Sequence, residues 1–454
     1  TAHENNIRVV MDVVVNHAGY NTIMDMYDYG FSSYETSVIT GRDWMHPMVA
    51  SGWQSHHEKY VFYSAAQLAK NGVKPTPITD WLKWWGPDWV RTGIEGYSAG
   101  NGSELQNPLA GLPDIKTEVT DPVAMAPIMQ TKWKLEAADG DDAYDTAIGG
   151  KYENYIVPAA KYLRNPDTKI APADHVIKSL AAWVEEFGID GFRCDTAKHI
   201  ELSRWKQLQS ECDASLKKWR AAHATDPASK WSDNFWMVGS DGGYFSNGFT
   251  TMLDFGFPLK NGGTGSTMIS TWAGYASTVN KAMPYINSHD MGKVGFFGKG
   301  SSCIPAGTAL LLNPSPVQIY YGDENDREKG PSCSDADMML RSDYQWGANP
   351  DKLAHWQKVG KFRNLNPAVG AGTQTSLTKQ ANAIVRKWKD NIVVIVVSAT
   401  GKMDIDVSEV TEWADGTKLR NGYNGEEAVV QGGKVSFTGE NGLILIENAI
   451  KIKR

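Results

Sequence analysis

The sequence predicts an α/β fold built on a parallel sheet, followed by a separate all-β domain. Between residues 174 and 363, short apolar segments of strand length alternate with longer segments of helical spacing. After about Gly372 the pattern changes to short strands separated by Gly, Asn and Asp turns. A length of 454 residues also favours more than one domain.

Residues 7–15 form an apolar run broken by Asp12, which predicts a parallel strand buried on both faces. No sustained period follows between residue 18 and about residue 115, so we expect an irregular subdomain there. The sequence therefore predicts three domains. They are a main α/β domain of residues 1–17 and 118–371, the excursion of residues 18–117, and an all-β domain of residues 372–454.

The remaining elements follow in chain order. A helix is expected over residues 174–187, with Asp174 before its apolar face and Gly188 at its end. Beyond it we expect strand 189–194, helix 202–222, strand 234–239, strand 283–286, helix 304–312, strand 317–321 and helix 355–363. The all-β domain is expected to be a sandwich with strands 383–387, 392–398, 435–438 and 443–447.

Composition narrows the class of partner. A formal net charge of -7 gives no basic field for a polyanion, so no nucleic acid is expected. No apolar run reaches the roughly 20 residues of a membrane span, so no membrane is expected either, and residues 1–20 lack a signal-peptide pattern. The 17 Trp and 18 Tyr suit stacking on sugar rings, although filling the core remains an alternative for each of them.

Four cysteines are too few for a disulfide scaffold. Cys194 and Cys212 lie in apolar strand and helix patterns, which predicts buried thiols. Cys303 and Cys333 lie in Gly/Ser/Pro-rich segments that read as loops, where a bridge between them is sterically easy. The cysteine count therefore favours an oxidising compartment for this protein, and no other feature of the composition bears on this point.

Polar clusters follow four of the predicted strands, at Asp12–His17, Gly191–His199, Phe235–Asp241 and Asn287–Asp290. The carboxyl ends of parallel strands meet at one edge, where barrel enzymes carry their catalytic residues. Strand alternation places Arg193 and Asp195 on one face, so the guanidinium can hold the carboxylate ionised and oriented. The alternative is a structural Arg/Asp pair.

These clusters, together with Leu112–Ile115 and Tyr320–Glu324, resemble the signature segments of the α-amylase clan of glycoside hydrolases. The segments 83–86, 112–118 and 341–343 are similar in particular to periplasmic α-amylases of enteric bacteria. The resemblance implies a (β/α)8 TIM barrel, an irregular domain B after strand 3 and a C-terminal antiparallel β-sandwich. It also implies retaining hydrolysis of α-1,4-glucosidic bonds in maltooligosaccharides or starch, and a periplasmic or secreted location.

The same resemblance assigns roles to residues. Asp195 would be the nucleophile, and Asp290 would stabilise the oxocarbenium-like transition state. The residues expected to bind substrate are His17, Arg193, Lys198, His199, His289 and Arg341. A Ca2+ site is implied at the side chains of Asn16 and Asp114 and the backbone carbonyl of His199. Plain hydrogen bonding among these residues is the alternative.

Two departures from the clan pattern stand out. The third cluster should read Gly-Glu but reads Gly239-Ser240-Asp241, which leaves no acid/base carboxylate at Ser240. Strand alternation turns Asp241 to the opposite face, so Asp241 is not expected to replace it. Residue 1 falls just before the segment that resembles the third barrel strand, so the first two strands and their helices are expected to be absent from this chain.

The sequence therefore predicts a glucan-cleaving enzyme impaired at Ser240. Two other functions remain open: a catalytically inactive glucan-binding protein, which the serine favours, and a transglycosylase, which would use the same residues. Only the products of the reaction would separate a transglycosylase from a hydrolase.

Overall fold

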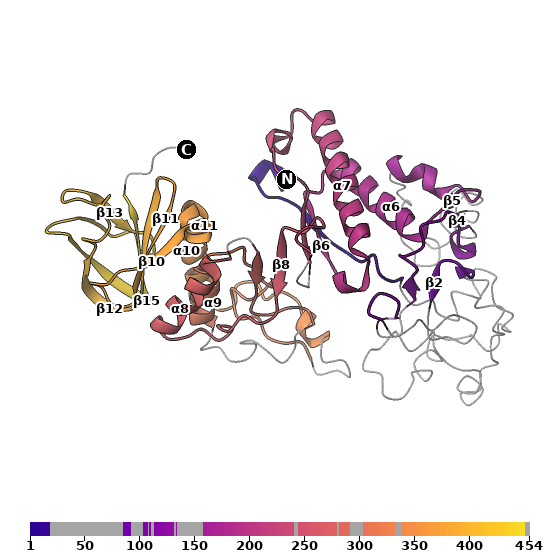
Figure 1. Ribbon diagram of the computed structural model, residues 1–454. Helices are drawn as coiled ribbons and strands as arrows, with labels where there is room; N and C mark the ends of the chain where they lie inside the picture. Colours follow the sequence, from indigo (N-terminus) through magenta and orange to yellow (C-terminus); the bar gives the residue numbers. More distant parts are fainter. Residues whose placement is uncertain are drawn as a thin grey trace. The chain divides into compact units, whose positions relative to one another are not determined.

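The computed structural model describes residues 1–18, 85–91, 103–107, 109, 113–130, 133, 158–239, 244–278, 281–290, 303–331 and 338–449. The chain divides into two compact units, Thr1–Thr250 and Thr251–Arg454, whose elements are labelled in Figure 1. In these ranges, no helix combines the length and the apolar character that crossing a membrane requires.

The first unit is organised by parallel strands. Strand β1 (Val10–Val13) pairs with β6 (Gly191–Cys194), and β6 pairs with β7 (Trp236–Gly239). The register sets Asp12 opposite Arg193, so the carboxyl ends of both strands lie at one edge. Helices α6 (Pro172–Phe187) and α7 (Leu202–Ala222) pack against each other (Figure 1). The predicted alternation of strand and helix is confirmed for these elements.

Helices α6 and α7 were the clearest predictions. The structure ends α6 at Gly188, whose left-handed backbone (φ 65°) is the conformation that glycine adopts without strain. Helix α7 begins and ends at the predicted residues. Cys194 and Cys212 are buried free thiols, as predicted.

The prediction that the first strand is buried on both faces is wrong. Val10 and Val14 are 44% and 40% exposed, and Ile7 is also exposed. Among the described residues of its unit, β1 pairs only with β6, so its other side has no neighbouring strand to cover it. An apolar run shows that a strand is able to be buried. It does not show whether another element is present to bury it.

Short elements surround these strands. The two-residue strands β2 (Val90–Arg91) and β3 (Asp114–Ile115) pair with each other, as do β4 (Val123–Ala124) and β5 (Lys169–Ile170). The short 3-10 helices are η1 (His3–Asn5), η7 (Pro158–Arg164), η8 (Ala197–His199) and η9 (Pro227–Lys230). Most of the predicted excursion at residues 18–117 lies outside the described residues.

The second unit begins with a parallel pair, β8 (Thr251–Asp254) and β9 (Ala282–Pro284). Its helices are α8 (Gly265–Ala276), α9 (Cys303–Leu311), η11 (Met338–Arg341), α10 (Pro350–Leu365) and α11 (Pro367–Ala371). Neither β8 nor α8 was predicted; α8 is rich in Gly, Ser and Thr, which weaken a helical pattern. The strand predicted at 317–321 is reduced to one bridge, between Tyr285 and Gln318.

Cys303 does not form the bridge with Cys333 that the sequence left possible. Cys303 is a buried free thiol in α9, and its Sγ donates to the backbone carbonyl of Asp323 at 3.3 Å. Burial raises the pKa of this thiol to about 12, so it is protonated at neutral pH. Cys333 lies outside the described residues.

The carboxyl-terminal strands are antiparallel, as predicted, but they form one six-stranded sheet in place of the two sheets of a sandwich. Its order is β10-β11-β12-β15-β13-β14. The bounds are β10 (Thr373–Ser376), β11 (Ala383–Trp388), β12 (Asn391–Asp406), β13 (Lys418–Asn421), β14 (Glu427–Val429) and β15 (Lys434–Asn448). The strands predicted at 435–438 and 443–447 are both parts of β15.

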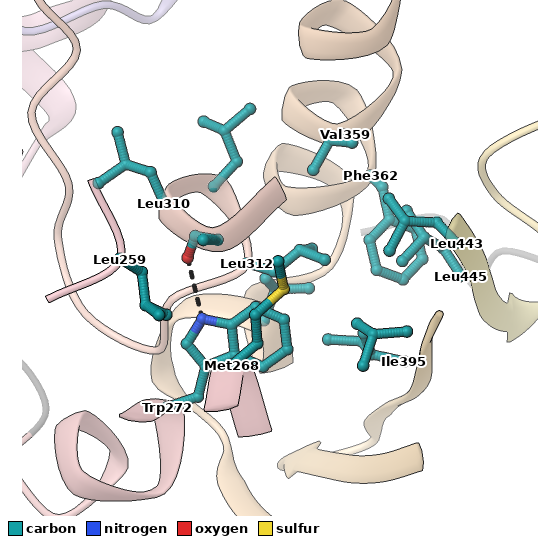
Figure 2. Close-up of a cluster of buried hydrophobic side chains, with 14 of the residues drawn as sticks. Leu259, Met268, Trp272, Leu310, Leu312, Val359, Phe362, Ile395, Leu443 and Leu445 are labelled. Atoms are coloured by element: carbon teal, nitrogen blue, oxygen red, sulfur yellow. Dashed lines mark hydrogen bonds between the residues drawn. The ribbon is translucent and has the colours of Figure 1, made fainter. Parts of the chain in front are cut away.

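Alternate residues of β12 enter two separate cores. Val393, Ile395 and Val397 join a cluster with the helices, whereas Val394 and Val396 join a second cluster made by the sheet itself. Figure 2 shows the first cluster, in which Trp272 of α8 lies fully buried. The indole Nε1 of Trp272 donates to the carbonyl of Ala309 at 2.9 Å, which satisfies its one polar atom.

The end of α6 gives a direct test of the packing. A Cβ at Gly188 would come within 2.4 Å of the Trp219 ring, in addition to requiring a left-handed backbone. We expect Gly188→Ala to lower the free energy of unfolding by roughly 2–5 kcal/mol, from about 1–2 kcal/mol of backbone strain and about 1–3 kcal/mol of overpacking. Urea denaturation measures this loss.

The matched control is Gly86→Ala in the same unit. Gly86 also has a positive φ (70°), but its Cβ would meet Pro127 at an ordinary 3.4 Å. Gly86→Ala should therefore lose only the free energy of unfolding that comes from backbone strain, about 1–2 kcal/mol. Equal losses in the two variants would contradict the proposed contact between Gly188 and Trp219.

Candidate active site

The pairing of Arg193 with Asp195 is present in the structure. Arg193 Nη1 donates to Asp195 Oδ1 at 2.7 Å and to Asp12 Oδ1 at 3.0 Å. Asp195 follows directly after β6, and its backbone N–H donates to the carbonyl of Val13 at 2.9 Å. Burial disfavours the charge on Arg193, but the two carboxylates outweigh it and raise the Arg193 pKa above its ordinary value. One guanidinium therefore orients two carboxylates at the carboxyl edge of the strands.

The predicted metal ligands also lie together. The buried side chain of Asn16 has one terminal amide atom 3.1 Å from Asp114 Oδ1 and 3.0 Å from the carbonyl oxygen of His199. Its other terminal atom lies 3.2 Å from Nδ1 of His17. Backbone bonds hold the segments together, since Ile115 donates to the Asn16 carbonyl at 2.8 Å. We call this group of Asn16, Asp114 and His199 the junction.

Two arrangements of the Asn16 amide fit the junction. With its NH2 group toward Asp114 and His199, the amide donates a hydrogen bond to each oxygen. With its oxygen toward them, three oxygens converge, and either a proton on Asp114, whose pKa is raised to about 7, or a cation would have to lie among them. The donor set of carboxylate, amide and carbonyl oxygen fits a hard cation. Within the described ranges, no cluster of three or more His, Cys, Asp or Glu side chains offers another metal site.

Asp114 is almost completely buried, and Arg91 is its direct ion-pair partner at 2.6 Å. Burial raises the pKa of Asp114 to about 7, although Arg91 opposes the rise. Glu118 also pairs with Arg91. Sequence reasoning missed Arg91 and Glu118, because the two-residue strand that carries Arg91 is too short to give a periodic signal.

The other residues predicted in this unit lie around the same edge. Burial lowers the pKa of His17 despite the nearby charge of Asp195, so His17 is neutral at neutral pH. Lys198 Nζ pairs with Glu104 at 2.9 Å, and His199 Nδ1 lies 2.6 Å from the Glu104 carbonyl oxygen. Glu104 therefore contacts two of the predicted substrate-binding residues. It was not predicted, since it lies in the segment without a period.

The second unit contains His289, Asp290 and Arg341. His289 Nε2 lies 2.9 Å from Asp290 Oδ2, and Arg341 Nη2 lies 3.1 Å from Asp290 Oδ1. The hydrogen bond from His289 is the main cause that holds the Asp290 pKa below its ordinary value; burial opposes it and Arg341 assists it. Asp290 is therefore an oriented carboxylate that is ionised at neutral pH.

Ser240 and Asp241 lie outside the described residues. The residue before them, Gly239, ends β7 and is confined by packing. A Cβ at Gly239 would come within 2.6 Å of the Phe249 ring, so a larger residue does not fit there. The glycine of the expected Gly-Glu motif thus has a packing reason in this chain.

The Asp290 group can be tested by titration. We expect His289→Gln to raise the Asp290 pKa toward its ordinary value, and Arg341→Ala to raise it less, because His289 is the larger cause. A lowered carboxyl pKa stabilises the fold above the ordinary pKa, and this stabilisation is lost as the pH falls through the folded value. Carboxyl-carbon NMR, assigned with Asp290→Asn, measures the shift. If Arg341→Ala raised the Asp290 pKa more than His289→Gln does, Arg341 and not His289 would be the main cause of the lowered pKa.

Comparison with curated proteins gives α-amylases and cyclomaltodextrin glucanotransferases as relatives, although no protein-family model matches the chain. The periplasmic alpha-amylase of Escherichia coli (strain K12) is 35% identical over 421 residues, which is 87% of this chain and 55% of that protein. The alpha-amylase of Streptomyces lividans is 32% identical over 246 residues, 42% of this chain and 25% of that protein. The chain spans about half the length of the first relative and a quarter of the second.

Solved structures agree in fold. The Anoxybacillus alpha-amylase superposes with a TM-score of 0.53 at 15% identity, covering 100% of this chain and 78% of that one. The alpha-amylase of Geobacillus thermoleovorans, complexed with acarbose, has a TM-score of 0.52 at 16% identity, covering 99% and 79%. These similarities show the fold of the α-amylases, a TIM barrel with a carboxyl-terminal sheet domain. Together with the 35% identity, they confirm the resemblance drawn from the motifs: this chain is a relative of the α-amylase clan of glycoside hydrolases.

Proposed function

We propose that this chain is an α-amylase-type glycoside hydrolase for α-1,4-linked glucans, and that Ser240 leaves it catalytically impaired. The observation that carries the proposal is Asp195, held at the carboxyl end of β6 by the guanidinium of Arg193. A carboxylate held in a fixed orientation is what attack on a glycosidic bond requires. The names of the relatives support the same substrate class, and the name of the Escherichia coli relative supports a periplasmic or secreted location.

In the proposed mechanism, an oxygen of Asp195 bonds to the anomeric carbon as the bond to the leaving oxygen breaks. Water then attacks the same carbon and releases Asp195. The resemblance assigns to Asp290, which His289 and Arg341 orient in the second unit, the role of stabilising the positive charge that develops on the sugar. The leaving oxygen needs a proton in the first step, and a serine hydroxyl at position 240 titrates far too high to supply it near neutral pH.

We further propose that the junction binds Ca2+ through the side-chain oxygens of Asn16 and Asp114 and the carbonyl oxygen of His199. The cation would supply positive charge to a buried carboxylate and would take no part in bond breaking. The nearly complete burial of Asp114 supports the proposal, since Arg91 alone leaves the pKa of Asp114 at about 7. Asn16, Asp114 and His199 come from three distant segments, so the ion would also tie these segments together.

A second candidate is a glucan-binding protein without catalysis. Ser240 in place of the acid/base favours it, because loss of that one carboxylate removes proton transfer and leaves the binding residues in place. A transglycosylase would keep the same mechanism and pass the glycosyl group to a sugar hydroxyl in place of water. Product analysis of an active variant separates transfer from hydrolysis.

Restoring the acid/base tests the enzyme proposal. We expect Ser240→Glu to raise cleavage of maltoheptaose by roughly a hundredfold to ten-thousandfold, the usual contribution of a general acid, with little change in affinity. Chromatography of the products gives the rate, and calorimetry on the unaltered chain and on both variants gives the affinity. Ser240→Gln is the matched control, because it adds a similar side chain without a carboxyl. Binding without cleavage by either variant would favour the glucan-binding protein.

Calcium binding is tested by thermal unfolding. At a hundredfold excess over its dissociation constant, an ion that binds only the folded state stabilises it by about 2.7 kcal/mol. We therefore expect CaCl2 to raise the unfolding temperature of the unaltered chain but not that of Asn16→Ala. The control is Asn287→Ala, which removes another buried Asn bonded to a buried Asp, Asp323, at 2.7 Å. An equal rise in all three proteins would refute binding at the junction.

A further inference from the structure

A buried guanidinium binds the backbone carbonyls of the two residues on either side of Arg341, Leu340 and Ser342. Arg327 is completely buried. Its Nη2 donates to the carbonyl of Leu340 at 2.8 Å, and its Nη1 donates to the carbonyl of Ser342 at 3.0 Å. The rigid fork of one arginine thus spans the backbone from which the Arg341 side chain projects.

Two tyrosines bind the same two carbonyls. The hydroxyl of Tyr320 donates to Leu340 at 2.9 Å, and the hydroxyl of Tyr321 donates to Ser342 at 2.8 Å. Each carbonyl therefore accepts one bond from a phenol and one from the guanidinium. Both lone pairs of each oxygen are used, so neither peptide can rotate without breaking two bonds.

The segment between the tyrosines and Arg327 is shaped for this contact. Arg327 stacks on the Tyr321 ring, 4.1 Å from its centre. Gly322 lies between them with a positive φ of 86°, and a Cβ there would come within 2.5 Å of Arg327. The Tyr-Tyr-Gly sequence therefore places two hydroxyls and leaves room for one guanidinium.

The ion pair that this backbone supports does not hold itself in place. The side chains of Arg341 and Asp290 are 47% and 55% exposed. Exposed ion pairs gain little free energy, because water screens the charges and two long side chains must be ordered. Fixing the backbone on both sides of Arg341 removes part of that ordering cost before the pair forms.

We propose that Tyr320, Tyr321 and Arg327, here called the clamp, are positioning residues that act through Arg341 to orient the Asp290 carboxylate. The proposal deepens the proposed function, because Asp290 is the residue placed there at the sugar ring. It gives a role to the Tyr320–Glu324 segment, to which the mechanism above assigns none. The clamp touches neither substrate nor reacting atoms.

The test removes one hydroxyl. Tyr321→Phe loses the bond to Ser342 and keeps the ring on which Arg327 stacks. In the full chain, we expect it to raise the pKa of the Asp290 carboxyl in the same direction as Arg341→Ala, by a smaller amount. The double variant should show no rise beyond that of Arg341→Ala alone, because the clamp acts through Arg341. Carboxyl-carbon NMR, assigned with Asp290→Asn, measures all four proteins.

The matched control is Tyr423→Phe in the same unit. It also removes one phenol hydroxyl, here one bonded to the buried His355 at 2.8 Å, and should leave Asp290 unchanged. An unchanged Asp290 titration in folded Tyr321→Phe would overturn the proposal. So would an equal rise with and without Arg341, since the hydroxyl would then act by another route. Tyr320→Phe, which loses the bond to Leu340, repeats the test if Tyr321→Phe does not fold.

The kinetics of glucan cleavage give a second test of the clamp, and its outcome is independent of the NMR titration. In the Ser240→Glu chain, we expect Tyr321→Phe to lower kcat on the order of three- to tenfold, with KM little changed, because the loss falls on the transition state. A Ser240→Glu chain without any cleavage contradicts the proposed function and leaves the titration result valid. If Tyr321→Phe raised the Asp290 pKa as expected but left kcat unchanged, the clamp would position Asp290 without affecting the reaction. That result would refute its role at the sugar.

Discussion

The buried carboxylate of Asp114 is the constraint on which the first unit depends. Removing a carboxylate from water is unfavourable unless positive charge and hydrogen-bond donors surround it. Arg91 supplies charge from β2. Asn16, which follows β1, contacts both Asp114 and the backbone carbonyl of His199 in the segment after β6. These segments are far apart in sequence, and the need to satisfy one carboxylate brings them together. Asp195, four residues before His199, is placed by the same arrangement.

An element or site residue could be predicted from the sequence where its cause lies within a short segment of the chain. Helices α6 and α7 followed from spacing and a glycine stop, which are properties of the segments themselves. The Arg193 and Asp195 pair followed from strand alternation over two residues. Arg91 and Glu104 could not be found in this way, because their roles arise from contacts with residues 23 and 94 positions away. Periodicity carries no information on such partners.

The failed predictions have the same origin. The run at 317–321 is apolar and aromatic enough for a strand, but the Tyr320 and Tyr321 hydroxyls bind backbone carbonyls about 20 residues further along the chain. Cys303 lies in a loop-like sequence, yet it is buried in α9 beside the Asp323 carbonyl. In both places a polar atom on an apparently ordinary side chain has a specific backbone partner. Composition and pattern treat such side chains as filler or as loop.

The two-sided burial of β12 has a consequence for how the carboxyl-terminal sheet assembles. A slip of one residue against β15 would move Val394 and Val396 into the place of Val393, Ile395 and Val397, so both cores would be lost at once. A pairing of β12 with β15 in a shifted register would therefore not be a stable intermediate in folding. The partners are also distant in sequence, with Val394 opposite Ile446, which makes their first encounter slow. The sheet should therefore form late and in one step, and the helices that share its first core cannot finish packing before it does.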